Sequence, residues 1–248
     1  MITLSNIHKS FNGNKVLRGL NLTIPAGQMF ALIGRSGIGK SVLLKHIVGL
    51  IKPDRGDIVI DGTNINHLRG KQIETMRRKF GFLFQEGALF DSLTVYDNVA
   101  FPLREKTTLA ESLIKEKVFT ELEHMGLKND AYKYPAELSG GMRKRAALAR
   151  AMIMQPSIML FDEPTTGLDP IIGQSILNYI QLCHRRVGFT GIIVTHDVPR
   201  VFSIVQKIAM LHEGTIILNG TYDEIMQQHN PIFEQFMSGT LNGPLSYS

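Results

Sequence analysis

Short apolar runs separated by turn residues fill the first third of the chain, and this pattern predicts β-strands. Three runs rich in branched side chains come first: Ile2–Ile7, Leu20–Ile24 and Met29–Ile33. From Gly39 the apolar residues recur at helical spacing until a turn at Pro53–Gly56 ends the helix. Strand-like runs then return at Ile58–Ile60 and Phe80–Phe84.

The middle of the chain, from about residue 85 to 155, has helical periodicity. Ile114, Val118, Leu122 and Met125 share one helix face, and Gly126 ends that helix. A second helix is predicted to open at Gly140 and to run to about residue 154, where Pro156 stops it.

Strand–helix alternation resumes after Pro156. The continuous apolar runs Ile158–Phe161 and Gly191–Val194 are typical of strands buried on both faces. An apolar stripe from Ile172 to Cys183 predicts the helix between them, and a hairpin is predicted around Glu213-Gly214. Buried strands that alternate with helices imply an α/β fold with a parallel core sheet, interrupted by a helical lobe.

Composition narrows the class of protein. The 248 residues are 44% hydrophobic, which allows a full core and argues against disorder. The net charge is +5, but the basic residues are dispersed, so a nucleic-acid role is not predicted. Cys183 is the single cysteine, which excludes an internal disulfide and suits a reducing compartment. We expect neither a signal peptide nor a bilayer-spanning segment, so a membrane role requires a partner.

A phosphate-binding loop follows the run Met29–Ile33. The sequence from Gly34 to Ser41 matches G-x-x-x-x-G-K-[ST] and enters a helix, as that motif requires. Its glycines let backbone N–H groups point at phosphate oxygens, and the helix N-terminus adds partial positive charge. Lys40 is expected to reach the β- and γ-phosphates, and Ser41 to bind Mg²⁺. The candidate ATP-binding residues here are Gly34, Arg35, Ser36, Gly37, Ile38, Gly39, Lys40, Ser41 and Val42.

Two carboxylates end the run Ile158–Phe161. Phosphoryl transfer needs a carboxylate for the metal and a group that orients water. Asp162 is predicted to hold Mg²⁺ and Glu163 to act as the general base. Adjacent acids are weak support alone, because they often cap helices; together with the phosphate loop they are strong.

Further motifs resemble those of ABC ATPases over nearly the whole chain. Leu138–Met142 is similar to the signature motif and ends 20 residues before Asp162. Glu163–Asp169 resembles the segment from the catalytic Glu to the D-loop, and Thr195–Asp197 resembles the H-loop. Gln85 falls at the position of the Q-loop Gln, and Phe11 resembles the aromatic residue that stacks on adenine.

This resemblance implies the remaining roles. His196 is expected to contact the γ-phosphate and help fix Glu163, and Gln85 to touch Mg²⁺. Ser139, Gly140 and Gly141 are expected to bind the γ-phosphate held by the other subunit of a homodimer, with Asp169 beside the nucleotide. Met142 departs from the usual Gln of the signature, and we expect hydrolysis to survive. Of the basic residues that follow, Arg143–Arg145, at least two are expected to lie on a solvated helix face.

The family also implies an architecture: a P-loop NTPase with a mostly parallel core sheet, an N-terminal antiparallel β subdomain and an inserted helical subdomain. On this basis one ABC ATPase domain spans residues 1–248. Residues 1–84 and 156–228 form its core, 85–155 the helical subdomain and 229–248 a C-terminal tail.

Within the family, the chain resembles the ATPases of Mla-type phospholipid transport systems. The similarity includes Gly39–His46, Phe84–Asp91, Met142 with Ala146–Arg150, and His196–Pro199, and it continues into the tail. It implies an integral membrane permease, a small STAS-domain protein bound to the ATPase, and indirectly an MCE lipid-binding protein. The expected location is peripheral, on the cytoplasmic side of the bacterial inner membrane. The apolar cluster Ala88–Phe90 with Leu93 and Val95 is either a permease contact or part of the chain's own core.

Three alternatives remain open. A soluble ABC protein of DNA repair or translation usually has tandem ATPase domains or long coiled-coil insertions, whereas here only a compact helical lobe separates Gln85 from Ser139. Another importer or exporter, for amino acids, metals or lipoproteins, is harder to separate, because the permease chooses the substrate. A non-hydrolysing binding module is disfavoured by the intact Lys40, Asp162, Glu163 and His196.

Overall fold

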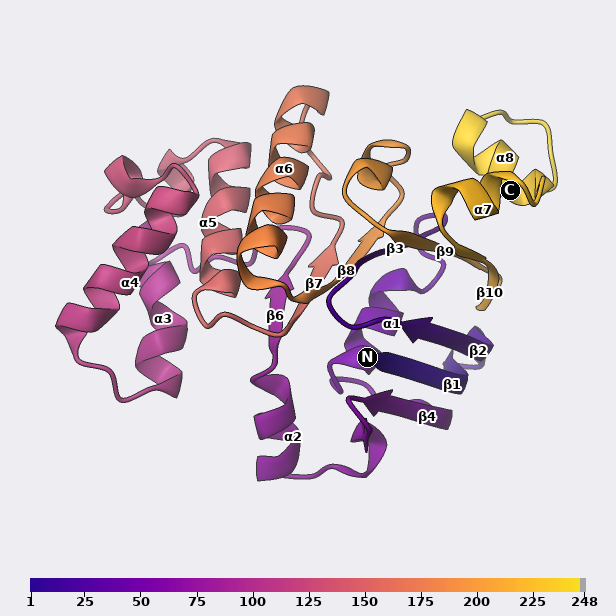
Figure 1. Ribbon diagram of the computed structural model, residues 1–248, viewed down its shortest axis with the longest axis horizontal. Coiled ribbons are helices and arrows are strands. Elements are labelled where there is room, and N and C mark those ends of the chain that lie inside the picture. The colour runs from indigo at the N-terminus through magenta and orange to yellow at the C-terminus, as the bar shows by residue number, and fades with distance from the viewer. Residues whose placement is uncertain (246–248) are drawn as a thin grey trace.

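The computed structural model describes residues 1–245, and the last three residues of the predicted tail lie outside that range. Two sheets organise it (Figure 1). The smaller, antiparallel sheet has the order β2-β1-β4-β5, formed by β1 (Ile2–Phe11), β2 (Asn14–Ile24), β4 (Arg55–Ile60) and β5 (Thr63–Asn64).

The larger sheet has six strands in the order β10-β9-β3-β8-β7-β6. All neighbours pair in parallel except β9 and β10, which form the antiparallel hairpin predicted around Glu213-Gly214. Its strands are β3 (Met29–Ile33), β6 (Phe80–Leu83), β7 (Ile158–Asp162), β8 (Thr190–Thr195), β9 (Lys207–His212) and β10 (Thr215–Gly220). The expected mostly parallel core sheet beside an antiparallel N-terminal sheet is therefore confirmed.

The helices cover both faces of the larger sheet. They are α1 (Lys40–Ile47), α2 (Lys71–Arg77), α3 (Val95–Lys106), α4 (Glu111–His124), α5 (Gly140–Met152), α6 (Pro170–Val187), α7 (Tyr222–Met226) and α8 (Pro231–Ser238). In Figure 1, α3, α4 and α5 gather at the end of the molecule away from the smaller sheet. None of the helices within residues 1–245 is long and apolar enough to cross a membrane.

Strand β3 contributes to two separate cores, because its successive side chains point to opposite faces. Phe30 and Leu32 pack with α1 and the smaller sheet. Met29, Ala31 and Ile33 pack with the helices on the other face. This double burial explains the continuous apolar run in the sequence.

The described part of the predicted tail contains helix α8 and packs on the rest of the chain. Asn230 caps α8 by accepting hydrogen bonds from Ile232 N and Phe233 N. Phe233 is buried in the main core, and the amide of Gln235 bonds both N and O of Leu245. The described part of the tail is therefore anchored on its own chain.

Candidate functional site

The phosphate loop connects β3 to α1 and requires its glycines for steric reasons. Gly34 has φ +148° and Gly39 has φ +111°, in a region that favours glycine. A Cβ atom on Gly34 would lie 2.6 Å from the carbonyl oxygen of Leu211. The loop can therefore curl over the end of β3 only with glycine at that position.

Lys40 folds its side chain into this loop. Its ammonium donates to the carbonyl oxygens of Gly34, at 2.7 Å, and Arg35, at 2.9 Å, and lies 3.6 Å from Oε1 of Glu163. The residue is only 5% exposed, and this burial lowers the pKa of Lys40, an effect that Glu163 partly offsets. The cation is thus held where phosphate oxygens would enter the loop.

Ser41 and Asp162 meet as predicted, with Oγ of Ser41 donating to Oδ1 of Asp162 at 2.8 Å. Burial raises the pKa of the Asp162 carboxyl, although the hydrogen bond from Ser41 opposes that shift. No cluster of three or more His, Cys, Asp or Glu side chains suited to a metal occurs in the described part of the chain. Mg²⁺ needs no such cage: it is commonly held by one or two protein oxygens, phosphates and water. A hydroxyl and a carboxylate fit that requirement.

Glu163 is oriented from several sides. Its Oε2 lies 2.9 Å from Nδ1 of His196 and 3.4 Å from both Oγ1 of Thr166 and the backbone N of His196. The residue is 8% exposed and has φ +49°, a left-handed conformation that is strained for a side chain with a Cβ. A carboxylate held this way beside a phosphate loop can accept a proton from attacking water.

These groups surround one cavity of about 330 Å³. From the predicted phosphate-binding set it is lined by Ser36, Gly37, Gly39, Lys40, Ser41 and Val42, together with Gln85, Glu163 and His196. Gly34, Arg35, Ile38 and Asp162 are not among its lining residues. Val16 from β2 also lines it, a contact that the sequence does not reveal because it arises only when the smaller sheet packs beside the loop. Phe11 does not line this cavity; its ring is 40% exposed at the end of β1, near the ammonium of Lys9.

The signature residues lie outside the cavity. Ser139 is exposed and caps α5, its Oγ accepting from Met142 N at 3.3 Å. Asp169 caps α6 by accepting from Ile171 N and Ile172 N. A Cβ on Gly141 would lie 2.6 Å from Cγ2 of Ile172, so the starts of the two helices pack closely. Ser139, Gly140, Gly141 and Asp169 therefore form a second surface rather than part of this chain's own pocket.

A polar network behind the site was not predicted. Asp197 accepts hydrogen bonds from Oγ1 of Thr165, at 2.7 Å, and from Nε of Arg200, at 2.9 Å. It ties the segment after Glu163 to the segment after His196. Thr165 and Asp197 stand inside the recognised motifs, but nothing in their spacing indicates that they meet.

The three basic residues after the signature differ in exposure, with Arg145 half-buried. Arg143 is exposed, but Lys144 is buried, and Arg145 donates to the carbonyl oxygen of Met125 at 2.7 Å. The reason is that α5 crosses the interior of the helical region, so that only one flank of its first turns faces solvent.

Comparison with known proteins gives the same reading. Residues 17–166 match the family model described as ABC transporter. The chain is 40% identical to the "Intermembrane phospholipid transport system ATP-binding protein MlaF" of Haemophilus influenzae, covering 100% of this chain and 94% of that protein. It is 41% identical to the "Probable ribonucleotide transport ATP-binding protein mkl" of Mycobacterium tuberculosis, covering 100% and 69%.

A solved structure is also similar. The ATP-binding cassette MJ0796, in a dimeric post-hydrolysis state bound to ADP and Pi, superposes with a TM-score of 0.81. It is 31% identical, and the match covers 89% of this chain and 98% of that one. The chain thus belongs to the ABC transporter family and is one of its ATPase subunits.

Proposed function

We propose that two copies of this chain close around two Mg-ATP molecules and drive a membrane permease that moves phospholipid. The observation that carries the proposal is the division of the site. Lys40, Ser41, Glu163 and His196 line one cavity, and Asp162 accepts a hydrogen bond from Ser41, whereas Ser139 is exposed on a different surface. A second copy can bring its Ser139 to the open side of that cavity, and the dimeric state of MJ0796 supports this arrangement.

Within each site we assign one role to each group. The loop N–H groups and Lys40 bind the β- and γ-phosphates. Ser41 and Asp162 hold Mg²⁺, which neutralises phosphate charge, and Gln85 lies on the same cavity. Glu163 takes the proton of the attacking water while His196 fixes its carboxylate.

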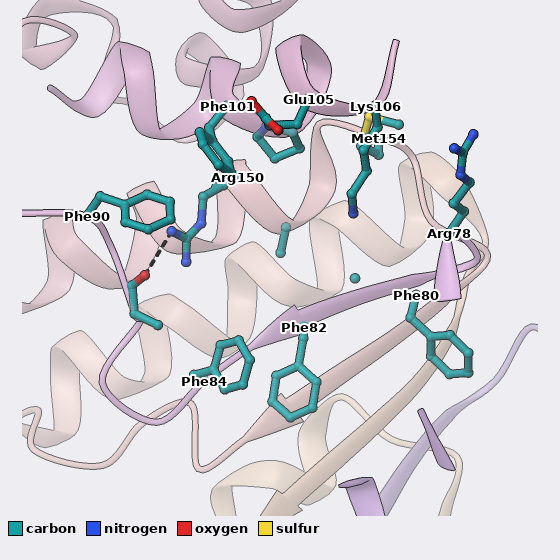
Figure 2. Close-up of a pocket in the computed structure, with 14 residues that line it drawn as sticks. Arg78, Phe80, Phe82, Phe84, Phe90, Phe101, Glu105, Lys106, Arg150 and Met154 are labelled. Atoms are coloured by element: carbon teal, nitrogen blue, oxygen red, sulfur yellow. Dashed lines mark hydrogen bonds between the residues drawn. The ribbon is translucent and has the colours of Figure 1, made fainter. Parts of the chain in front are cut away.

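A groove of about 380 Å³ is the proposed permease contact (Figure 2). Its walls carry the rings of Phe82, Phe84, Phe90 and Phe101, with Arg78 and Glu105 at the rim. Phe90 is 44% exposed, whereas Val95 is fully buried, so the apolar cluster seen in the sequence divides between surface and core. An apolar groove with a charged rim suits an amphipathic helix.

Phospholipid as cargo is supported by the 40% identity to the Haemophilus influenzae MlaF protein over the whole chain. The assembly that follows would include a permease, a STAS-domain protein and an MCE lipid-binding protein, at the cytoplasmic side of the inner membrane. The comparable identity to mkl makes ribonucleotide transport the second candidate.

The groove can be tested by co-purification from membranes. Phe90→Asp should abolish recovery of the permease while leaving Mg-ATP binding intact, because Phe90 is not among the residues that line the nucleotide cavity. Leu50→Asp is the matched control, since Leu50 is also exposed but lies outside the groove. Recovery of the permease with Phe90→Asp would show that the groove is wrongly assigned.

The cargo can be tested after the co-purifying membrane protein is reconstituted in liposomes. ATP-dependent movement of a fluorescent phospholipid, lost in Lys40→Ala, is the expected result. Movement of a radiolabelled ribonucleotide instead would replace the phospholipid proposal and leave the ATPase assignment intact.

A further inference from the structure

The segment after β6 is fastened to α5 by a buried lysine and a half-buried arginine. We call residues 85–90 the bridging segment. The ammonium of Lys144, which is 7% exposed, donates to the carbonyl oxygen of Gln85. Glu86 and Glu163 are the acidic groups whose field acts on this ammonium. A buried lysine needs such a partner, because an unpaired buried charge is costly.

Arg150, two turns along the same helix, holds the middle of the bridging segment. Its guanidinium donates to the carbonyl oxygens of Gly87 and Ala88, both at 2.8 Å, and lies 5.7 Å from the ring centroid of Phe90. Figure 2 shows the bond to the Ala88 carbonyl beside the ring of Phe90. One planar side chain thus fixes two successive carbonyls, which a single-point donor cannot do.

The bridging segment also packs on the helical region through apolar and neutral contacts. A Cβ on Gly87 would lie 3.2 Å from the Cβ of Ala147 on α5. Asn98 of α3, fully buried, accepts from Phe90 N at 2.8 Å and donates to Phe90 O at 3.0 Å. The contacts of the bridging segment described here are therefore with α3 and α5, although the chain enters it from the sheet.

The two ends of the bridging segment face different sites. Gln85 lines the nucleotide cavity, and Phe90 lines the groove of Figure 2. The signature residue Ser139 caps the N-terminus of helix α5, which holds the segment. A rigid connection of this kind would make the three positions move together.

We propose that Lys144 and Arg150 are positioning residues that clamp the bridging segment to α5, so that Gln85, Phe90 and Ser139 shift as one body. The inference rests on the proposed function, because that assigns the two sites. The inference names the side chains that connect the nucleotide cavity to the groove. Without the clamp, movement at the groove would no longer set the position of Gln85.

Distances between spin labels test this directly in the full chain. Cys183 is buried, so introduced cysteines can be labelled selectively. One pair joins Ala88 to Glu116 on α4, and a second joins Ala88 to Arg55 on β4; all three residues are exposed. In the protein that retains Lys144 and Arg150, the distance distribution of the first pair should be narrow and unchanged by Mg-ATP. The distance of the second pair should change when Mg-ATP binds.

Lys144→Met and Arg150→Met should broaden the distance distribution between positions 88 and 116 about twofold, as expected for a locally released segment. Lys144→Arg should restore the narrow distribution, because it keeps a donor; a variant that merely fails to fold would not be rescued in this way. Arg143→Met is the control, since Arg143 donates to Leu138 O and not to the bridging segment.

If the distance distribution of the first pair is no broader in either methionine variant, the proposal that Lys144 and Arg150 hold the bridging segment is wrong. A first distance that changes with Mg-ATP in the unsubstituted protein would overturn it as well. The measurement without nucleotide separates this inference from the proposed function. If Mg-ATP changed no distance, the proposed ATP-driven cycle would be contradicted. Broadening in the methionine variants without nucleotide would still support the roles of Lys144 and Arg150.

Discussion

Oε2 of Glu163 lies 2.9 Å from Nδ1 of His196, while Oε1 of the same carboxylate lies 3.6 Å from the ammonium of Lys40. The carboxylate is therefore held between the lysine that we propose binds phosphate and the histidine that we propose faces the γ-phosphate. This position suits a base that acts only when nucleotide is bound, and it leads to the first prediction.

Glu163→Gln should keep the shape of the site but remove the proton acceptor. We expect the rate of phosphate release to fall by about 10²–10⁴-fold, the usual contribution of a general base. The variant should also accumulate as a dimer with Mg-ATP, measured by light scattering. Glu213→Gln is the control, because its side chain is 73% exposed in the β9–β10 turn. Near-normal turnover in Glu163→Gln would remove Glu163 from this role.

Lys40→Ala should weaken nucleotide binding. A ligand present at 100 times its Kd stabilises the fold by about 2.7 kcal/mol. Most of that gain should disappear in the variant, measured as the change in Tm on adding Mg-ATP. Lys71→Ala, at an exposed position of α2, should keep the gain. An unchanged Tm shift in Lys40→Ala would contradict the phosphate-binding role.

Asp162→Asn should stabilise the nucleotide-free protein and abolish stabilisation by Mg-ATP. Burial raises the pKa of Asp162, so the folded state binds a proton more readily than the unfolded chain. The Asp162 carboxyl therefore lowers the free energy of unfolding as pH rises from its pKa in the unfolded chain through its higher pKa in the folded protein. The gain in Tm should be present at neutral pH and vanish below about pH 4, where the carboxyl is protonated in both states. Asp91→Asn, at an exposed site, should show no such pH dependence.

Gly34→Ala should destabilise the phosphate loop. Its Cβ would meet the Leu211 carbonyl at 2.6 Å in a backbone conformation that already disfavours alanine, so we expect a loss of about 1–3 kcal/mol or more. At Gly62, φ is +80° with open space around the added atom, so Gly62→Ala should cost only about 1–2 kcal/mol. Urea unfolding curves compare the two, and equal losses would exclude the contact with Leu211 as a cause.

Cys183 should be chemically silent in the folded protein. It is 3% exposed on α6, and burial raises the pKa of its thiol to about 12, so very little thiolate forms at neutral pH. Iodoacetamide should label it only after unfolding, followed by mass spectrometry. Rapid labelling of the native protein would show that α6 opens locally.

The sequence predicted most of what depends on neighbours along the chain. The glycines around Lys40, the two acids at the end of β7 and the strand β3 all follow from local pattern, and the structure places them as expected. Contacts made through space were less accessible. The approach of Val16 to the nucleotide cavity, the bond of Thr165 to Asp197 and the burial of Lys144 depend on how whole elements pack, which spacing does not encode.

Because β3 sends Phe30 and Leu32 into one core and Met29, Ala31 and Ile33 into the other, the phosphate loop is mounted where two independently packed layers meet. Loss of packing in either core therefore shifts β3 and, with it, the phosphate loop. Substitutions deep in the smaller sheet, far from any nucleotide, should therefore raise the KM for ATP before they unfold the protein.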